Sequence, residues 1–146
     1  MKVDCFLDTN VLIYAALGRK TEEFKRKRAN ELIGSRQFGI SAQVLQEFYW
    51  VATTKAESPL TPSEALEWIE QLEEQPCASI DRSLVKIAIE ISQRYRIAYW
   101  DGAVIAASEE LGTEVLYTED LNHGQMYGSV RVLNPFVESA RSPGSR

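Results

Sequence analysis

The chain opens with a short apolar run that gives way to residues at helical spacing. The run, Val3 to Leu7, predicts a buried strand, interrupted only by Asp4. It stops at Asp8, after which apolar residues recur with the period of a helix. Because ligands of open α/β sheets bind at the carboxyl ends of the strands, Asp8 is a candidate functional residue. Helix capping by Asp8 or Asn10 explains the same position equally well.

The same alternation of short strands and longer helices continues along the chain. Further strands are predicted over these segments: Phe38 to Ile40, Cys77 to Ile80, Val115 to Thr118, and Val130 to Leu133 as an edge candidate. Helices are predicted over these ranges: Glu22 to Ile33, Ala42 to Thr54, Pro62 to Glu74, the residues from Asp81 to Tyr95, and Asp101 to Gly112. Candidate caps precede four of them: Thr21, Ser41, Thr61 and Asp81. Leu66 and Ile87 are expected to face inward.

The order of these elements is β-α-α-β-α-α-β-α-α-β-β. It predicts an α/β fold, a three-layer α/β/α sandwich with a mainly parallel sheet and right-handed crossovers. With 146 residues, one domain is expected over residues 1–137, followed by a flexible tail over 138–146. No apolar run approaches the roughly 18 residues of a membrane span, and no signal-peptide segment opens the chain, so we expect a cytoplasmic protein without a membrane partner.

Cysteine and histidine content argues against a zinc site. Cys5 and Cys77 lie far apart in apolar, strand-like contexts and are expected to be buried free thiols. His123 is the single histidine, which argues against a Cys/His zinc centre and excludes a histidine pair for acid–base cleavage of RNA.

The net charge of −5 argues weakly against a nucleic-acid partner. That argument fails if clustered acids hold cations, since a bound metal reverses the local field. A basic segment also follows the first helix: Arg19, Lys20, Lys25, Arg26, Lys27 and Arg28. It is either a solvated helix face or a patch that contacts phosphates.

Three more acids lie at positions comparable to that of Asp8. Glu47 shares the apolar face of its helix, where a carboxylate is costly unless something compensates it, although it could also reach solvent at the edge of that face. Asp101 opens a small-residue, apolar helix, where capping alone would explain an acid. Asp120 follows a strand together with Glu119, and the sequence leaves open which of the two faces the site.

In a doubly wound sheet, Asp8, Glu47, Asp101 and Asp120 converge at the carboxyl edge. Four crowded carboxylates would raise one another's pKa, and a divalent cation relieves that repulsion. Carboxylates with water are the ligand set of Mg²⁺ or Mn²⁺, which activate water in phosphoryl displacement. The chain has no P-loop, GxGxxG or GxSxG motif, and a metal-dependent phosphodiesterase needs none of them.

Four segments together resemble a known family. LDTNVLIY, QVLQEFYWV, YWDGAVIAAS and LYTEDLNHGQ occur in the order and at the spacing of a PIN domain, and more narrowly of the VapC-type toxins of toxin–antitoxin pairs. The resemblance covers about residues 1 to 136. It implies that Asp8, Glu47, Asp101 and Asp120 hold one or two Mg²⁺ or Mn²⁺ ions. Asp8 and Asp101 would be direct ligands.

The resemblance also implies the reaction and the partners. The reaction is endonucleolytic hydrolysis of RNA by metal-activated water, which leaves a 3′ hydroxyl and a 5′ phosphate. Thr9, Asn10 and Thr118 match polar residues that orient the site. The protein would form a homodimer and be silenced by a cognate antitoxin protein. The basic stretch, Lys25, Arg26, Lys27 and Arg28, would contact RNA phosphates.

The sequence allows several roles for four aromatic residues, and three alternative functions are compared with that of a toxin. Tyr49, Trp50, Tyr99 and Trp100 could stack RNA bases, line the antitoxin groove or belong to the core. One alternative is a PIN nuclease of RNA processing or DNA cleavage without a toxin role, and another is a binding module without catalysis. A phosphatase with a phosphorylated aspartate is disfavoured, because Asp8-Thr9-Asn10 lacks the second aspartate such enzymes use.

Overall fold

A computed structural model describes residues 3–18 and 22–137 of the chain. Six strands form one sheet, and their bounds are β1 Cys5–Leu7, β2 Phe38–Ser41, β3 Cys77–Ala78, β4 Val115–Tyr117, β5 Met126–Tyr127 and β6 Val130–Leu133. Their order across the sheet is β3-β2-β1-β4-β6-β5. All neighbouring strands are parallel except β5 and β6, which pair antiparallel. The predicted α/β class with a mainly parallel sheet is confirmed.

One strand was missed by the sequence pattern. The two residues of β5 turn back onto β6, so β6 is an interior strand rather than the expected edge. Gly128 adopts a left-handed backbone conformation at φ 62° in the turn between them. A two-residue strand shows no alternation of apolar and polar positions, and therefore leaves no period to detect.

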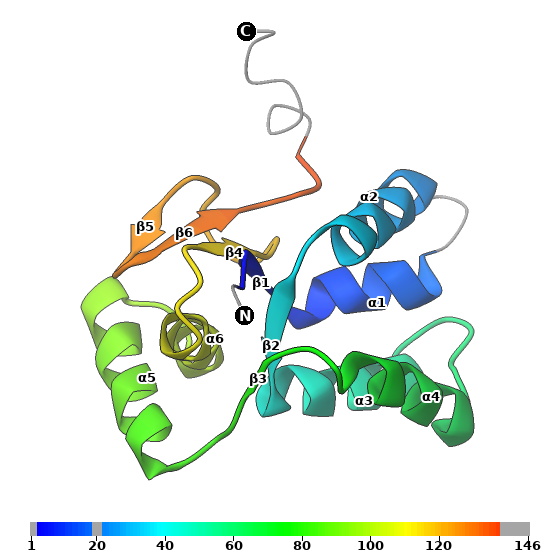
Figure 1. Cartoon of the computed structure of the whole chain (residues 1–146), viewed down its shortest axis with the longest axis horizontal. Helices are drawn as coiled ribbons and strands as arrows, with labels where there is room; N and C mark the ends of the chain where they lie inside the picture. Colours follow the sequence, from blue (N-terminus) through cyan, green and yellow to red (C-terminus); the bar gives the residue numbers. More distant parts are fainter. Residues whose placement is uncertain (1–2, 19–21, 138–146) are drawn as a thin grey trace, which may run out of the picture.

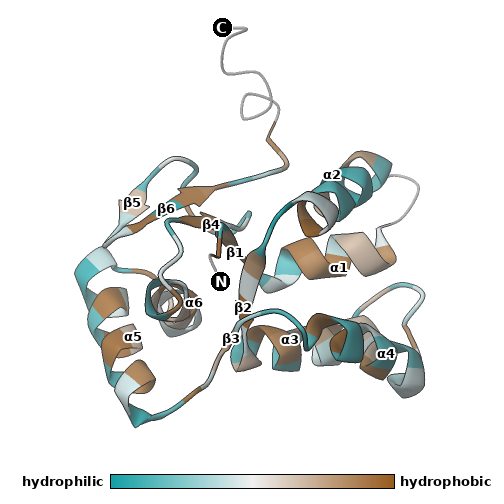
Figure 2. Ribbon diagram, in the orientation of Figure 1, coloured by the Kyte–Doolittle hydropathy of each residue, from teal (hydrophilic) through white to brown (hydrophobic). Residues whose placement is uncertain are grey.

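Six helices cover the two faces of the sheet in the described part of the chain. Their bounds are α1 Thr9–Leu17, α2 Glu23–Ser35, α3 Ala42–Thr54, α4 Pro62–Leu72, α5 Arg82–Tyr95 and α6 Tyr99–Glu110. Figure 1 shows α5 and α6 on one side of the sheet and α1, α2 and α3 on the other. Figure 2 shows that α2 carries mostly hydrophilic residues, whereas the sheet strands beside it are apolar. The three-layer arrangement is therefore confirmed.

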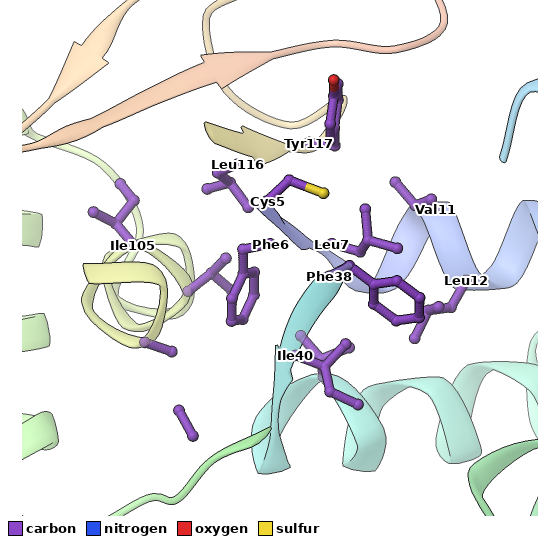
Figure 3. Packing of buried hydrophobic residues seen from close by; sticks show 14 of the residues in the cluster. Cys5, Phe6, Leu7, Val11, Leu12, Phe38, Ile40, Ile105, Leu116 and Tyr117 are labelled. Carbon is purple, nitrogen blue, oxygen red and sulfur yellow. The ribbon is translucent and has the colours of Figure 1, made fainter. Parts of the chain in front are cut away.

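The core lies on both sides of β1, the central strand. Figure 3 shows Phe6 directed toward Ile105 of α6, while Leu7 lies toward Val11 and Leu12 of α1. All five side chains are fully buried. Successive residues of a strand face opposite sides of a sheet, so three residues of β1 anchor both helical layers. This packing fixes the position of Asp8, the next residue.

Most predicted caps are confirmed. Ser41 accepts a hydrogen bond from Val44 N at 3.2 Å, and Asp81 accepts one from Leu84 N at 2.9 Å. Thr61 and Glu64 form a reciprocal capping box with Pro62 at the first helical position. The Thr21 cap and the tail over residues 138–146 lie outside the described residues. Helix α2 runs to Ser35, two residues beyond its expected end.

Other expectations about burial were wrong. Leu66 is 52% exposed and Ile87 is 42% exposed. Each lies beyond the buried stripe of its helix, which runs through Ala65 and Leu72 in α4 and through Ala88 in α5. Cys77 is free, as expected, but exposed, because it lies on the edge strand β3; Cys5 is free and buried.

Helix α6 begins earlier than expected. Tyr99 is its first residue and Ala98 its N-cap, so Asp101 lies within the first turn and forms no side-chain cap. The expectation that this helix opens at Asp101 was therefore wrong, and capping, the alternative explanation for this acid, does not apply to it. Within the described residues, no helix is both long and apolar enough to cross a membrane.

Candidate active site

Asp8 follows β1 and is both a helix cap and part of a larger site. Its Oδ1 accepts a hydrogen bond from the Thr9 amide at 2.7 Å, and its Oδ2 accepts one from Thr118 Oγ1 at 2.8 Å. The residue is 5% exposed. Burial above all, with smaller contributions from the charges of Asp120 and Glu47, raises the pKa of Asp8 to about 7, although the two hydrogen bonds lower it. The carboxylate is therefore held in an environment that disfavours its charge.

Two other aspartates join Asp8. Asp101 reaches the site from the first turn of α6, and Asp120 from the segment after β4. One carboxylate oxygen from each of the three aspartates can be chosen so that all lie within 4.8 Å of one another. Burial, followed by the charges of Asp120 and Glu47, raises the pKa of Asp101. Burial and the adjacent Glu119 charge raise the pKa of Asp120.

Glu47 lies beside this cluster and is held by two neighbours. Thr9 Oγ1 donates to Glu47 Oε1 at 2.8 Å, and Gln43 Nε2 approaches Glu47 Oε2 at 3.4 Å. Gln43 also donates to the Trp100 carbonyl at 3.2 Å, which ties α3 to the start of α6. The compensation that a half-buried carboxylate requires therefore comes from Thr9 and Gln43. Glu47 is not one of the three acids that converge within 4.8 Å.

Hydrogen bonds from Asn10 and Thr118 connect Asp8 with Asp120. The Asn10 amide donates to Thr118 Oγ1 and to Asp120 Oδ2, each at 3.2 Å. Thr118 Oγ1 also accepts the Asp120 backbone N–H at 3.1 Å while donating to Asp8. The predicted orienting residues, Thr9, Asn10 and Thr118, thus all contact an acid of the site. Asn10 Oδ1 is buried and has no hydrogen-bond partner within the described residues.

Asp120, and not Glu119, contributes to the acidic cluster. Glu119 instead accepts a hydrogen bond from Tyr14 Oη at 3.0 Å and pairs with Lys25 Nζ at 3.3 Å. The sequence left this choice open, since both acids follow the same strand. Geometry separates them: Asp120 has an oxygen close to those of Asp8 and Asp101, whereas Glu119 is neutralised by a cation.

The basic stretch of α2 is largely engaged within the protein. Lys25 pairs with Glu119, Arg26 with Glu23 three residues earlier, and Arg28 with Glu31 at 3.7 Å. Arg28 Nε also donates to the Pro135 carbonyl at 3.3 Å. Lys27 is exposed and forms no hydrogen bond or ion pair within the described residues. The RNA-contact role of this stretch stays a prediction.

A cleft of about 1250 Å³ opens over the acids. Besides the aspartates, Trp50 and Trp100 line it, although their side chains are 58% and 62% exposed. Lys55 is the single lysine or arginine among the described lining residues. Small-molecule pockets measure about 300–1,000 Å³, so this cleft has room for part of a polymer.

The donor set fits a divalent cation. Three carboxylates converge with raised pKa values, and within the described residues none of them pairs with a lysine or arginine. Asn10 also belongs to the site, because its amide nitrogen donates to Asp120, and its Oδ1 atom has no hydrogen-bond partner within the described residues. Carboxylate and amide oxygens are hard ligands of the kind that Mg²⁺ and Mn²⁺ prefer.

Two residues of the site were not recognised from the sequence. Gln43 precedes Glu47 by one helical turn, and a second polar residue on that apolar face was the signal that could have found it. Tyr14 gave no such signal, because a tyrosine on a largely apolar helix is ordinary core material. Its contact with Glu119 joins residues 105 positions apart.

Comparisons with known proteins identify the family and the fold. The family model described as "PIN domain" matches residues 5–128. No curated protein matches the chain.

Three solved structures show the fold. A toxin–antitoxin complex from Klebsiella pneumoniae is similar at TM-score 0.68 and 18% identity, over 91% of this chain and 98% of that one. The Sarcin-Ricin loop cleaving toxin VapC20 of Mycobacterium tuberculosis is similar at TM-score 0.66 and 16% identity, over 88% and 99%. FitAcB from Neisseria gonorrhoeae follows at TM-score 0.59 and 21% identity, over 90% and 98%. By its family match and its fold, the chain belongs to the PIN-domain family.

Proposed function

We propose that this protein is a Mg²⁺- or Mn²⁺-dependent endoribonuclease and the toxin of a type II toxin–antitoxin pair. The observation that carries the proposal is the convergence of Asp8, Asp101 and Asp120, each of which offers one oxygen within 4.8 Å of the other two, in the lining of a cleft. Crowded acids without a paired cation are costly in a folded protein, and a divalent ion would offset that cost.

The three aspartates would act as metal ligands, and Glu47 would have a different role. Asp8, buried and fixed by Thr9 and Thr118, offers the most rigid ligand atom, and Asp101 and Asp120 complete the set from two other elements. When bound, the metal ion would lower the pKa of a water molecule and offset charge on the scissile phosphate. Glu47 would orient that water from the neighbouring helix, where Thr9 and Gln43 hold its carboxylate in place.

The shape and lining of the cleft favour unpaired RNA as the substrate. The indole rings of Trp50 and Trp100 are exposed on the same cleft that holds the acids. Exposed aromatic rings bind single-stranded nucleic acid by stacking against unpaired bases. Trp100 precedes Asp101 directly, and Trp50 lies three residues after Glu47 in α3, so stacked bases would flank the acids.

The toxin role is supported by the structural relatives. Similar chains come from a toxin–antitoxin complex and from a toxin that cleaves the Sarcin-Ricin loop. We propose that a cognate antitoxin covers the acidic cleft of this protein, where an arginine could bind the carboxylates in a bidentate manner. Homodimer formation and a cytoplasmic location belong to the same proposal.

Incubation with a mixed RNA pool tests this function. Antitoxin-free protein is assayed with Mg²⁺, with Mn²⁺ and with EDTA, on a pool that includes transfer and ribosomal RNA. Cutting that requires a divalent ion, and ends that carry a 5′ phosphate, are expected. Cutting in EDTA at the same rate would contradict the metal requirement.

A further inference from the structure

A cation on α2 is held against the acid next to Asp120. Lys25 Nζ donates to Tyr14 Oη at 3.0 Å and to Glu119 Oε1 at 3.3 Å, and Tyr14 Oη donates to Glu119 Oε2 at 3.0 Å. The ammonium group also lies 4.7 Å from the Tyr14 ring centroid and 5.7 Å from that of Phe136. We call Lys25, Tyr14 and Glu119 the lysine clamp.

Helix α2, which carries Lys25, is held in place by hydrogen bonds to other parts of the protein. Asn30 of α2 donates to the Ala15 carbonyl at 3.2 Å, and Arg28 donates to the Pro135 carbonyl at 3.3 Å. Gly18, which ends α1, allows this close approach, since a Cβ atom there would lie 2.5 Å from Arg26 Cβ. Helix α2 thus offers a fixed point from which Lys25 can hold a neighbouring segment.

The held segment carries a ligand of the candidate metal site. Glu119 and Asp120 are adjacent in the chain, and on the other side Asn10 and Thr118 contact Asp120. The segment is therefore fixed from both sides, with Glu119 turned to the clamp and Asp120 turned to Asp8 and Asp101. Without the clamp, Glu119 would carry an uncompensated charge and compete with Asp120 for a cation.

We propose that Lys25 and Tyr14 are positioning residues that hold Glu119 out of the metal site and thereby present Asp120 to the divalent ion. This inference rests on the proposed function, because it assigns a role toward the metal ion of that site. It gives the first lysine of the basic stretch a different task from contacting RNA. Residues around metal ligands change metal affinity by about 10- to 100-fold when they are replaced.

Equilibrium binding of Mn²⁺ alone, without RNA, tests the clamp. Isothermal titration at pH 8 compares wild type, Lys25→Met, Tyr14→Phe and the matched control Lys27→Met. Methionine keeps the apolar stem that packs on the Tyr14 and Phe136 rings while removing the charge. We expect the Kd for Mn²⁺ to rise about ten-fold in Lys25→Met and in Tyr14→Phe.

The sign of the change separates positioning from simple electrostatics. Removal of a positive charge near an acidic site should by itself strengthen cation binding, and Lys27→Met is expected to show that small effect or none. Weaker binding in Lys25→Met therefore requires the loss of a geometric role. In the double variant Lys25→Met, Glu119→Gln, the competing carboxylate is gone, and the Kd is expected to return toward that of wild type.

Two results would overturn the inference, and they are distinguishable. If wild type binds Mn²⁺ and Lys25→Met has the same Kd as Lys27→Met, the role of the lysine clamp is rejected and the proposed metal site is retained. If wild type binds no Mn²⁺, both the role of the lysine clamp and the proposed metal site are rejected. Thermal unfolding of each variant in EDTA verifies that the variants are folded, so that weaker binding cannot be ascribed to unfolding.

Discussion

Thr118 Oγ1 donates a 2.8 Å hydrogen bond to Asp8 Oδ2 and so joins the ends of two neighbouring parallel strands, β4 and β1. The same hydroxyl oxygen accepts from the Asn10 amide and from the backbone N–H of Asp120. One buried side chain thus contacts two of the three acids of the candidate site. Its loss should disturb both acids at once.

Replacement of Thr118 by valine preserves its shape and removes the hydroxyl group. The Thr118 hydrogen bond lowers the pKa of Asp8, so Thr118→Val should raise that pKa further. We expect about ten-fold weaker Mn²⁺ binding at pH 7 and a loss of about 1–3 kcal/mol in the free energy of unfolding. Calorimetric titration measures the first and denaturant unfolding the second. Thr118→Ser keeps the hydroxyl group, and equal losses in both variants would show that packing is responsible.

The stability of the metal-free protein should fall as pH rises. Burial raises the pKa of Asp8 to about 7, far above the roughly 3.9 of an unfolded chain. Between these values the folded state binds the extra proton, so stability is present below about pH 4 and is lost progressively toward pH 7. The loss from this group is up to about 4 kcal/mol. Thermal unfolding in EDTA from pH 5 to pH 8 measures the part of this loss that falls above pH 5.

Added Mg²⁺ should reverse that trend. The ion binds the deprotonated carboxylates, so the increase in Tm on adding Mg²⁺ should be larger at pH 8 than at pH 5. Asp8→Asn should abolish most of the pH dependence in EDTA and most of the Mg²⁺ effect. A Tm that is independent of pH and of Mg²⁺ would contradict the account of the acidic cluster.

The sequence was sufficient to predict the layers of the fold and to select Asp8 and Asp101 as candidate residues of the site. Asp8 was found because a strand and a helix meet there, and the strand period and the helix period change at that residue. The choice between Glu119 and Asp120 was out of reach, because it depends on Lys25 and Tyr14, which lie on other elements. Contacts between residues about 100 positions apart leave no periodic trace in a single sequence.

The ion pairs of the basic stretch were also not predictable from the sequence. Lys25 to Arg28 form a run of four cations in the sequence, yet three of them pair with acids of the folded protein. A charge run shows how many ions are present and not which partners they meet. Helix ends were more predictable, since capping residues and their partners lie within three residues of one another.

An exposed tryptophan of the cleft should contribute to RNA binding. In an Asp8→Asn background, which prevents cutting, Trp50→Leu is expected to weaken the binding of a mixed-sequence single-stranded RNA by about 5- to 150-fold, whereas Trp50→Phe keeps most of the affinity. Fluorescence anisotropy with a labelled oligonucleotide gives the Kd. Tyr49→Leu is the matched control, because Tyr49 is 39% exposed on the same helix and does not line the cleft. Equal RNA affinity of Asp8→Asn and of its three double variants would contradict base stacking on Trp50. The exposed indole would then be a candidate contact for a protein partner instead.

Gly102 allows α6 to pack closely against α5, and a larger residue should displace Asp101. A Cβ atom at Gly102 would lie 2.6 Å from the Ala88 carbonyl oxygen. We expect Gly102→Ala to cost about 1–3 kcal/mol in the free energy of unfolding and to reduce the cleavage rate measured well below its Tm. Gly34→Ala is the control, since nothing lies within 4 Å of the added atom in α2, and it should stabilise by about 0.5–1 kcal/mol. A Gly102→Ala protein with unchanged stability would show that the helix contact is not tight.

The central claim is that the three converging aspartates would hold a divalent metal ion on which the hydrolysis of RNA by this protein depends. It is tested most directly by the rate of cleavage of a mixed RNA pool in Mg²⁺ and in EDTA, by wild type, Asp101→Asn and Asp81→Asn. Asp81 is an exposed helix cap outside the site, and asparagine caps a helix equally well, so this variant controls for the loss of one carboxylate. We predict that wild type and Asp81→Asn cleave RNA in Mg²⁺ and that neither cleaves it in EDTA. The rate of Asp101→Asn in Mg²⁺ should be at least 100-fold lower, which corresponds to an activation barrier about 2.7 kcal/mol higher. Full activity of folded Asp101→Asn protein would contradict the account.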